Sequence, residues 1–178
     1  MRYLGPVLGM TVIAAAFGGW VIALAPDFDD TTGAATQPAA LPPDVDPAAI
    51  ERAALSAFKQ FAKLQSGFDM AYLSYYHEDA AIHLRRLLPQ GGTDTLEFRR
   101  GNWAGLQQQR YANSAGGVAE AGGPAYSQLH THVEGSLVII EAKRWVAAEN
   151  HTGPYKVALV RTDAGDWKII EEWIESAM

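Results

Sequence analysis

Apolar and polar residues are distributed along this chain in three patterns, and each pattern predicts a different kind of element. The first is a largely apolar run over residues 4–25, which contains no charged side chain. A helix needs about 20 such residues to cross the hydrocarbon core of a bilayer. The run therefore predicts one transmembrane helix, preceded by a tail of residues 1–3.

The second pattern is helical spacing, and it begins after a Pro-, Ala- and Asp-rich stretch, residues 26–45, which we interpret as a flexible linker. Asp46 can cap a helix, and Pro47 suits its first position. Apolar residues then recur every three or four positions as far as Leu64. Two shorter helical patterns follow at 69–76 and 102–112, so we expect three helices in this half.

The third pattern is the alternation typical of β-strands. It predicts strands at 81–88, 95–99, 128–134, 137–146, 155–162 and 167–174. Gly- and Asn-containing turns at 89–92, 150–154 and 163–166 separate some of them. Helices first and antiparallel strands last indicate an α+β domain, which we place at residues 46–178.

The apolar run has two interpretations, a cleaved signal peptide and a retained anchor. Arg2 and the small residues around Ala25 fit a signal peptide. The run is too long for one, however, and Pro26 would follow the cleaved bond, where proline suits a protease poorly. We favour a retained signal anchor.

Small residues recur at helical spacing inside the predicted anchor. Gly5 pairs with Gly9, and Ala14 with Gly18. Such pairs allow close contact between helices in lipid, although glycine and alanine are also simply common in short anchors. We interpret these four residues as a possible packing surface.

The charges flanking the run predict its orientation. Arg2 precedes it, whereas Asp27, Asp29 and Asp30 follow it, and no Lys or Arg recurs before Arg52. The positive-inside rule then places residues 1–3 in the cytoplasm. In a bacterium, this predicts a single-pass protein of the inner membrane whose C-terminal domain lies in the periplasm.

Composition narrows the classes of partner and chemistry. The formal net charge is −6, which argues against nucleic acid as a partner. The chain contains no cysteine, which excludes disulfides and thiolate chemistry. We predict no cofactor.

Three segments carry a resemblance to a known fold family. They are residues 67–82 with the sequence Tyr76-His77-Glu78-Asp79-Ala80-Ala81-Ile82 at their end, residues 98–101, and residues 158–170. The domain resembles the nuclear-transport-factor-2-like (NTF2-like) superfamily, which includes the ketosteroid-isomerase-like and SnoaL-like groups. This resemblance implies a cone of three N-terminal helices packed on a curved, mainly antiparallel sheet. It also implies a small apolar ligand in the cone and an open sheet face that often mediates dimerisation.

The resemblance does not extend to the isomerase machinery. An ungapped alignment places Leu84 where ketosteroid isomerases hold their general-base aspartate, and Gln60 where they hold an oxyanion-binding tyrosine. Leucine cannot accept a proton, and glutamine is a weaker donor to an enolate. Steroid isomerisation is therefore not expected.

Other side chains remain as candidates for a site in the cone. His83 with Tyr72 or Tyr75 could transfer protons if His83 faces the interior. The alternative places His83 on the outer face of its strand, with its neighbours Ile82 and Leu84 in the core, and this leaves fewer charges to desolvate. We predict that Tyr72, Tyr75 and Trp103 line a ligand pocket.

A strand with alternating polar residues offers a weak candidate metal site. His130, His132 and Glu134 share one face of the predicted strand 128–134. Two histidines at this spacing can converge on zinc or copper, but a third ligand in good geometry is needed. A solvated or dimer-facing polar stripe explains the same pattern, and we favour that explanation.

Two hypotheses of function follow. The first, which we favour, is a membrane-tethered interaction or accessory domain that dimerises or docks on a larger membrane complex. The second is an enzyme or carrier for a small apolar molecule held in the cone, with acid–base chemistry of the dehydratase or hydrolase type.

Overall fold

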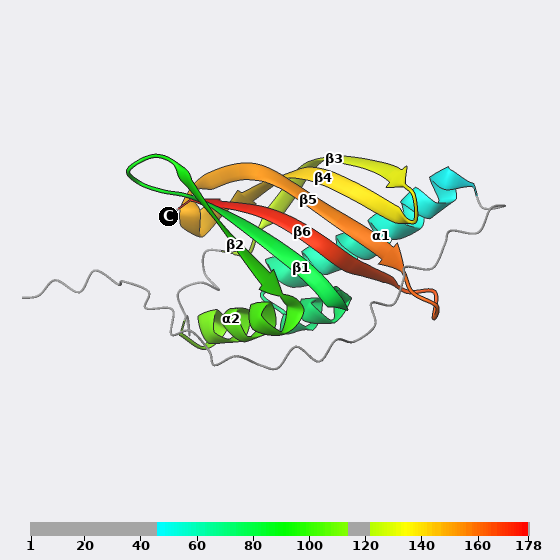
Figure 1. Cartoon of the computed structure of the whole chain (residues 1–178), viewed down its shortest axis with the longest axis horizontal. Coiled ribbons are helices and arrows are strands. Elements are labelled where there is room, and N and C mark those ends of the chain that lie inside the picture. The colour runs from blue at the N-terminus through cyan, green and yellow to red at the C-terminus, as the bar shows by residue number, and fades with distance from the viewer. Residues whose placement is uncertain (1–45, 114–121, 178) are drawn as a thin grey trace, which may run out of the picture. The chain divides into compact units, whose positions relative to one another are not determined.

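Six strands form one curved sheet in the order β2–β1–β6–β5–β4–β3 in the computed structural model shown in Figure 1. The structure describes residues 46–113 and 122–177. The strands are β1 (Tyr76–Leu87), β2 (Thr93–Arg99), β3 (Ala125–Glu134), β4 (Leu137–Val146), β5 (His151–Arg161) and β6 (Trp167–Ala177). Strands β1 and β6 pair in parallel, and the other neighbouring pairs are antiparallel. The expected α+β class and the curved, mainly antiparallel sheet are confirmed.

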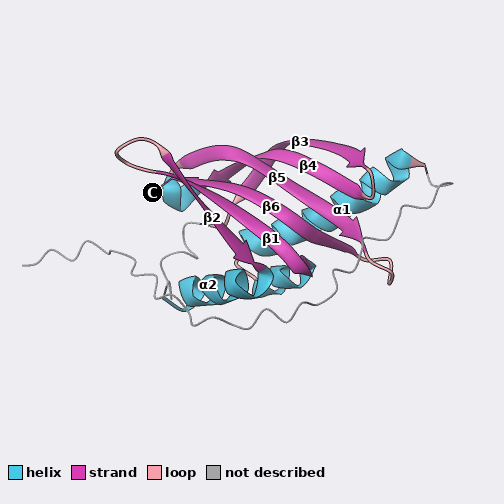
Figure 2. Cartoon of the chain, in the orientation of Figure 1, coloured by secondary structure: helices cyan, strands magenta, loops and turns pink. Residues whose placement is uncertain are grey.

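The helices lie on one face of this sheet, as Figure 2 shows. Helix α1 (Pro47–Ser66) packs against β3 and β4, and helix α2 (Arg100–Asn113) packs against β1 and β2. Between them in sequence lies a short 3₁₀ helix, η1 (Met70–Tyr75), and a second one, η2 (Ala147–Glu149), joins β4 to β5. The two long helices therefore cover opposite halves of the sheet, and the core fills the space between them.

The start of α1 follows from the sequence. The Asp46 carboxylate accepts a hydrogen bond of 3.0 Å from the backbone N–H of Ala48, and Pro47 occupies the first turn. This cap satisfies a donor that the helix itself cannot pair. The buried residues then fall on one stripe at helical spacing: Ile50, Ala54, Phe58, Phe61 and Gln65.

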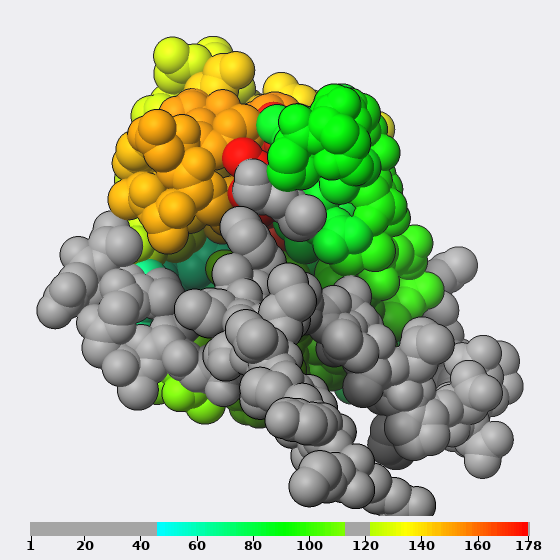
Figure 3. Space-filling view, turned by 90° about the vertical axis from the view of Figure 1, so that its left-hand side faces the viewer, coloured from blue at the N-terminus to red at the C-terminus, as the bar shows by residue number. Residues whose placement is uncertain are grey.

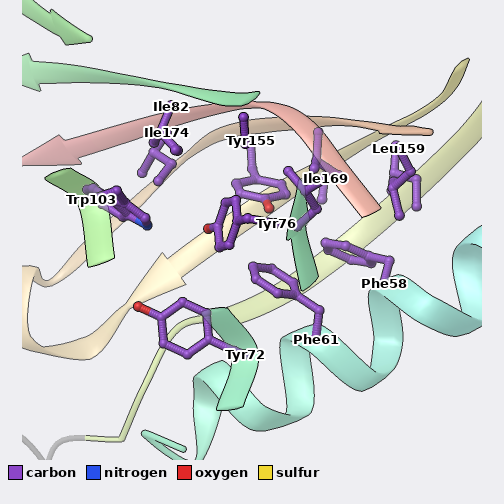
Figure 4. Close-up of a cluster of buried hydrophobic side chains, with 14 residues drawn as sticks. Phe58, Phe61, Tyr72, Tyr76, Ile82, Trp103, Tyr155, Leu159, Ile169 and Ile174 are labelled. Atoms are coloured by element: carbon purple, nitrogen blue, oxygen red, sulfur yellow. The ribbon is translucent and has the colours of Figure 1, made fainter. Parts of the chain in front are cut away.

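Aromatic rings from α1, η1 and the sheet form the centre of the core (Figure 4). The ring centroid of Phe61 lies 5.8 Å from those of both Tyr72 and Tyr76, with the rings nearly perpendicular. Phe58 packs edge-to-face on Tyr126, with centroids 5.3 Å apart, and in a tilted arrangement on Tyr155, with centroids 5.9 Å apart. Such edge-to-face pairs add to the gain from burying apolar area. These contacts hold α1 and η1 against the sheet.

Several predicted boundaries differ from the structure, most of all at the starts of β1 and β5. The helical pattern at 69–76 forms the short 3₁₀ helix η1, and β1 begins directly after it at Tyr76 rather than at residue 81. The predicted turn at 150–154 is mostly strand, because Asn150 alone adopts the left-handed conformation (φ 45°) and ends η2. Asparagine tolerates this conformation better than most residues, so β5 can start at His151.

The predicted tail (1–3), membrane anchor (4–25) and linker (26–45) lie outside the described residues. Gly5, Gly9, Ala14 and Gly18 lie there too, as do residues 114–121. Across residues 46–113 and 122–177, no helix is both long enough and apolar enough to cross a bilayer.

The end of α1 is fastened to the segment that leads into β3. The backbone N–H of Gly123 donates to the Ser66 carbonyl at 3.0 Å, and the Ser66 hydroxyl donates to the Pro124 carbonyl. A Cβ added to Gly123 would lie 2.7 Å from Ser66 Cα, closer than such atoms can approach. Only glycine therefore fits at this crossing.

Gly123→Ala should lower the free energy of unfolding by about 1–3 kcal/mol, because backbone must move to admit the methyl group. The matched control is Gly101→Ala in α2, where a Cβ meets no atom within 4 Å. That change should be neutral or stabilise by about 0.5–1 kcal/mol. Urea denaturation of the two variants measures both effects. Equal stability of the two variants would show that the Gly123 crossing is not tight.

Candidate functional site

A cavity of about 330 Å³ opens between η1, α2 and the end of β4. Part of its wall is apolar, formed by Phe68, Met70, Trp103 and Val146 among others. The polar part of the wall comes from Gln65, Tyr72, Gln107, Arg110, Arg144 and Glu149. A mainly apolar hollow with a few convergent polar groups is the usual form of a small-molecule site.

The 3₁₀ helix η2 forms one end of the cavity and is bonded to the end of β6. Figure 3 shows this side of the molecule, with the last residues of β6 (red) between the β1–β2 hairpin (green) and the segment around η2 (orange). The backbone N–H of Ala177 donates to the Glu149 carboxylate at 3.1 Å. This bond fixes η2, and with it the cavity residues Ala148 and Glu149.

A fully buried carboxyl group lies behind the cavity wall. Glu172 on β6 has no exposed surface, and its two oxygens accept hydrogen bonds from the hydroxyls of Tyr76 at 2.5 Å and Tyr155 at 2.7 Å. Burial raises the pKa of Glu172, while the two tyrosine donors and the nearby Arg144 guanidinium oppose that rise. The pKa remains above its ordinary value, so desolvation is the stronger effect.

The neighbouring tyrosines remain protonated because they are buried beside this carboxyl group. Burial raises the pKa of Tyr76 and of Tyr155, and the charge of Glu172 raises both further. Tyr126 packs its ring against that of Tyr155, with centroids 4.7 Å apart, and its hydroxyl donates to the Gln65 side chain. Polar groups therefore extend from Glu172 toward Gln65 at the cavity wall.

Tyr72 has its side chain at the cavity itself. It is only 4% exposed, and its pKa is raised by burial and, to a smaller extent, by Glu172. Arg110 and Arg144 oppose this shift but do not cancel it. The Tyr72 hydroxyl thus stays protonated at neutral pH and can donate a hydrogen bond to a bound molecule.

Several nitrogen donors around the cavity have no acceptor within the described part of the chain. They are Nε1 of Trp103, Nε2 of Gln107, and Nε and Nη1 of Arg144, and all are shielded from water. A buried donor without a partner costs about 1–3 kcal/mol. Each belongs to a residue that lines the cavity, so a ligand toward which these side chains turn could supply the missing acceptors.

The structure separates the residues that the sequence suggested for the pocket. Tyr72 and Trp103 line the cavity, but Tyr75 does not. The Tyr75 hydroxyl instead donates to Gln60 at 3.0 Å, beside a second, open hollow of about 420 Å³. Leu84 packs against the core, and neither it nor Gln60 lines the first cavity.

The suggested proton-transfer pair of His83 and Tyr72 is not formed. Ile82 on β1 is buried in the core and Leu84 packs against it, so His83 between them points to the other face of the sheet. There its ring stacks on Trp173, with centroids 5.3 Å apart, and Lys156 lies 4.8 Å from the centre of the same indole. His83 therefore belongs to the outer face of the sheet.

The weak metal candidates lie on the edge strand β3. His130, His132 and Glu134 are all exposed there, and Leu129, Thr131 and Val133 between them are half-buried. In the part of the chain that the structure describes, no three His, Cys, Asp or Glu side chains are grouped to hold a metal ion. A solvated polar stripe accounts for these three residues.

Sequence reasoning missed Glu172, Tyr155 and Arg144. One signal was present, since Glu171 and Glu172 are adjacent in a predicted strand and adjacent residues point to opposite faces. One of the two glutamates therefore had to face the helices. A buried glutamate needs donors close by, and the tyrosines supply them.

Solved structures show which fold this is, whereas no family model and no curated protein matches the sequence. A protein of unknown function from the DUF3225 family of Pectobacterium atrosepticum is 15% identical, with a TM-score of 0.56 over 78% of this chain and 98% of that one. An NTF2-like protein of unknown function from Pseudomonas putida is 16% identical, with a TM-score of 0.52 over 71% and 85%.

A third similar structure carries a suggested activity in its name. It is a candidate dehydratase of the NTF2-like family from Streptomyces avermitilis, 12% identical, with a TM-score of 0.50 over 75% of this chain and 99% of that one. At such low identities the likeness shows the fold alone. The domain therefore has the NTF2-like fold that the sequence suggested.

Removing either hydroxyl that binds Glu172 should destabilise the protein. Tyr76→Phe and Tyr155→Phe should each lower the free energy of unfolding by about 1–3 kcal/mol, because each leaves a buried carboxyl oxygen unpaired. Tyr75→Phe is the control, since its exposed bond to Gln60 should contribute less than about 0.5 kcal/mol. Urea denaturation measures all three. An equal loss in the control would contradict a special role for the buried pair.

Glu172 should also make stability depend on pH. The carboxyl group is protonated in both states below its unfolded pKa, near the ordinary value of 4.5. As pH rises, the unfolded state loses its proton first, so the wild type becomes less stable until pH passes the raised folded pKa. Glu172→Gln should remove this loss. Urea denaturation of both proteins from about pH 4 to pH 8 measures the difference, which a pH-independent gap would refute.

Proposed function

We propose that this domain binds a small, partly apolar organic molecule in the cavity between η1, α2 and β4. The observation that carries the proposal is the cavity itself, because four buried donor nitrogens without acceptors belong to residues of one apolar hollow. Its volume of about 330 Å³ lies within the range of about 300–1,000 Å³ that is usual for small-molecule sites.

The chemistry of the wall supports binding better than proton abstraction. Tyr72 is held protonated and acts as a donor. Glu172, the buried group able to accept a proton, does not line the cavity and is already bonded to Tyr76 and Tyr155. His83 lies on the other face of the sheet. We therefore propose a carrier or binding domain. The dehydratase activity in the name of the Streptomyces protein is not part of this proposal.

The membrane-tethered role remains a prediction from residues 4–25. It is compatible with ligand binding, since an anchor would hold the domain near a membrane. The accessory function predicted from the sequence is supported by that anchor and by the absence of the isomerase residues at Leu84 and Gln60. Small-molecule binding in the cavity is a function that does not depend on the anchor.

A bulky side chain at the cavity rim tests the proposal. Ala148 and Ala147 are both exposed on η2, but only Ala148 lines the cavity. Ala148→Trp should weaken the binding of a small molecule at least about tenfold, which corresponds to about 1.4 kcal/mol, and Ala147→Trp should leave it unchanged.

Binding is followed by the indole N–H resonance of Trp103 in ¹H–¹⁵N spectra, assigned with Trp103→Phe. The full chain is titrated with a fragment panel that includes 2-naphthamide and 2-naphthoate. The proposal predicts a shift of this resonance that needs at least about ten times more fragment in Ala148→Trp than in the wild type. It fails if no fragment moves the resonance, or if both tryptophan variants respond alike.

A further inference from the structure

We propose that the ligand of this cavity carries a carboxylate, and that Arg144 binds it together with Gln107 and Trp103. The inference rests on the proposed function, because it names the chemical class of the molecule held in the cavity. It concerns only the residues of the cavity wall and no catalytic step.

The unpaired groups of the wall are all donors. Two of the three guanidinium nitrogens of Arg144, the amide nitrogen of Gln107 and the indole nitrogen of Trp103 lack an acceptor among residues 46–113 and 122–177. Each of these nitrogens carries hydrogen to donate and has no lone pair to accept with. A wall of this kind selects a ligand that brings acceptor oxygens.

Arg144 determines which acceptor suits the wall best. Its planar, permanently charged fork matches the two oxygens of a carboxylate, and charge-assisted bonds of this type are about twice as strong as neutral ones. Arg144 lies on β4 two residues before Val146, on the inner face of the strand, and both residues line the cavity. Its unpaired nitrogens are shielded from water, so we expect the guanidinium and the Gln107 amide to turn toward the bound ligand.

The charges of the wall favour a single negative charge over a phosphate, because Arg110 and Arg144 bring two positive charges and Glu149 brings one negative charge. Glu149 also lines the cavity, and its carboxylate is held by the backbone N–H of Ala177. A doubly charged group would be repelled by it more strongly than a carboxylate. Glu172 competes little for Arg144, since burial raises its pKa and both of its oxygens are bonded to tyrosines. The remaining wall is largely apolar, so the expected ligand is a carboxylic acid with an apolar body.

The test compares 2-naphthoate with 2-naphthamide, which share one ring system and differ in charge. Calorimetric titration of the full chain should show that naphthoate binds at least about tenfold more tightly, the effect of one or two charge-assisted hydrogen bonds. Arg144→Met should bring the ratio of the two affinities close to one. Arg144→Lys, which keeps the charge but not the fork, should give a smaller preference than the wild type.

Lys143→Met is the matched control, because it removes the same charge from the adjacent, exposed residue of β4. It should leave the ratio unchanged.

If both probes move the Trp103 resonance but naphthoate binds no more tightly than naphthamide, the carboxylate assignment is wrong and the binding site stands. If Arg144→Met keeps the preference, Arg144 is not the carboxylate ligand. If no fragment of the panel moves the resonance, the proposed function fails first. Should Arg144→Met not fold, the wild-type ratio and Arg144→Lys still decide.

Discussion

The buried carboxyl group of Glu172 is the constraint around which this domain is built. Three adjacent strands meet at it, because Glu172 belongs to β6 while its donors Tyr76 and Tyr155 belong to β1 and β5. An unpaired carboxylate in this position would cost far more than a hydrogen bond returns. Two tyrosines must therefore reach it, and their rings form the centre of the aromatic core on which α1 and η1 pack.

This arrangement divides the polar groups of the interior into two sets. The inner set is satisfied, since both oxygens of Glu172 are bonded and Tyr126 donates to Gln65. The outer set lines the cavity and includes the donors of Trp103, Gln107 and Arg144, which have no acceptor in the described ranges. The satisfied network stabilises the fold, whereas the unpaired donors beside the cavity can bind the acceptors of a ligand. The same cone therefore contains a structural region and a ligand-binding region.

Much of the fold could be predicted from the sequence, because burial follows the apolar pattern directly. The strand 137–146 has the predicted bounds, and the stripe from Ile50 to Phe61 is the buried face of α1. The site was harder to predict. Arg144 and Lys143 look equivalent in the sequence, and only the packing of β4 tells which one faces the cavity. Tyr72 and Trp103 were found because aromatic residues are expected at pockets, and Tyr75 fits the same expectation but lies outside.

Glu172 shows why counting along a strand cannot locate such a site. Ile169 faces the core, so strict alternation would bring Glu171 inward as well. The pairing shifts there, because Leu159 lies opposite Ile169 while Ala158 lies opposite Glu171, which leaves Ile170 as an extra residue. Such a bulge reverses the faces beyond it, and Glu172 and Ile174 become the inward residues. One extra residue in β6 thus decides which of two adjacent glutamates meets the tyrosines.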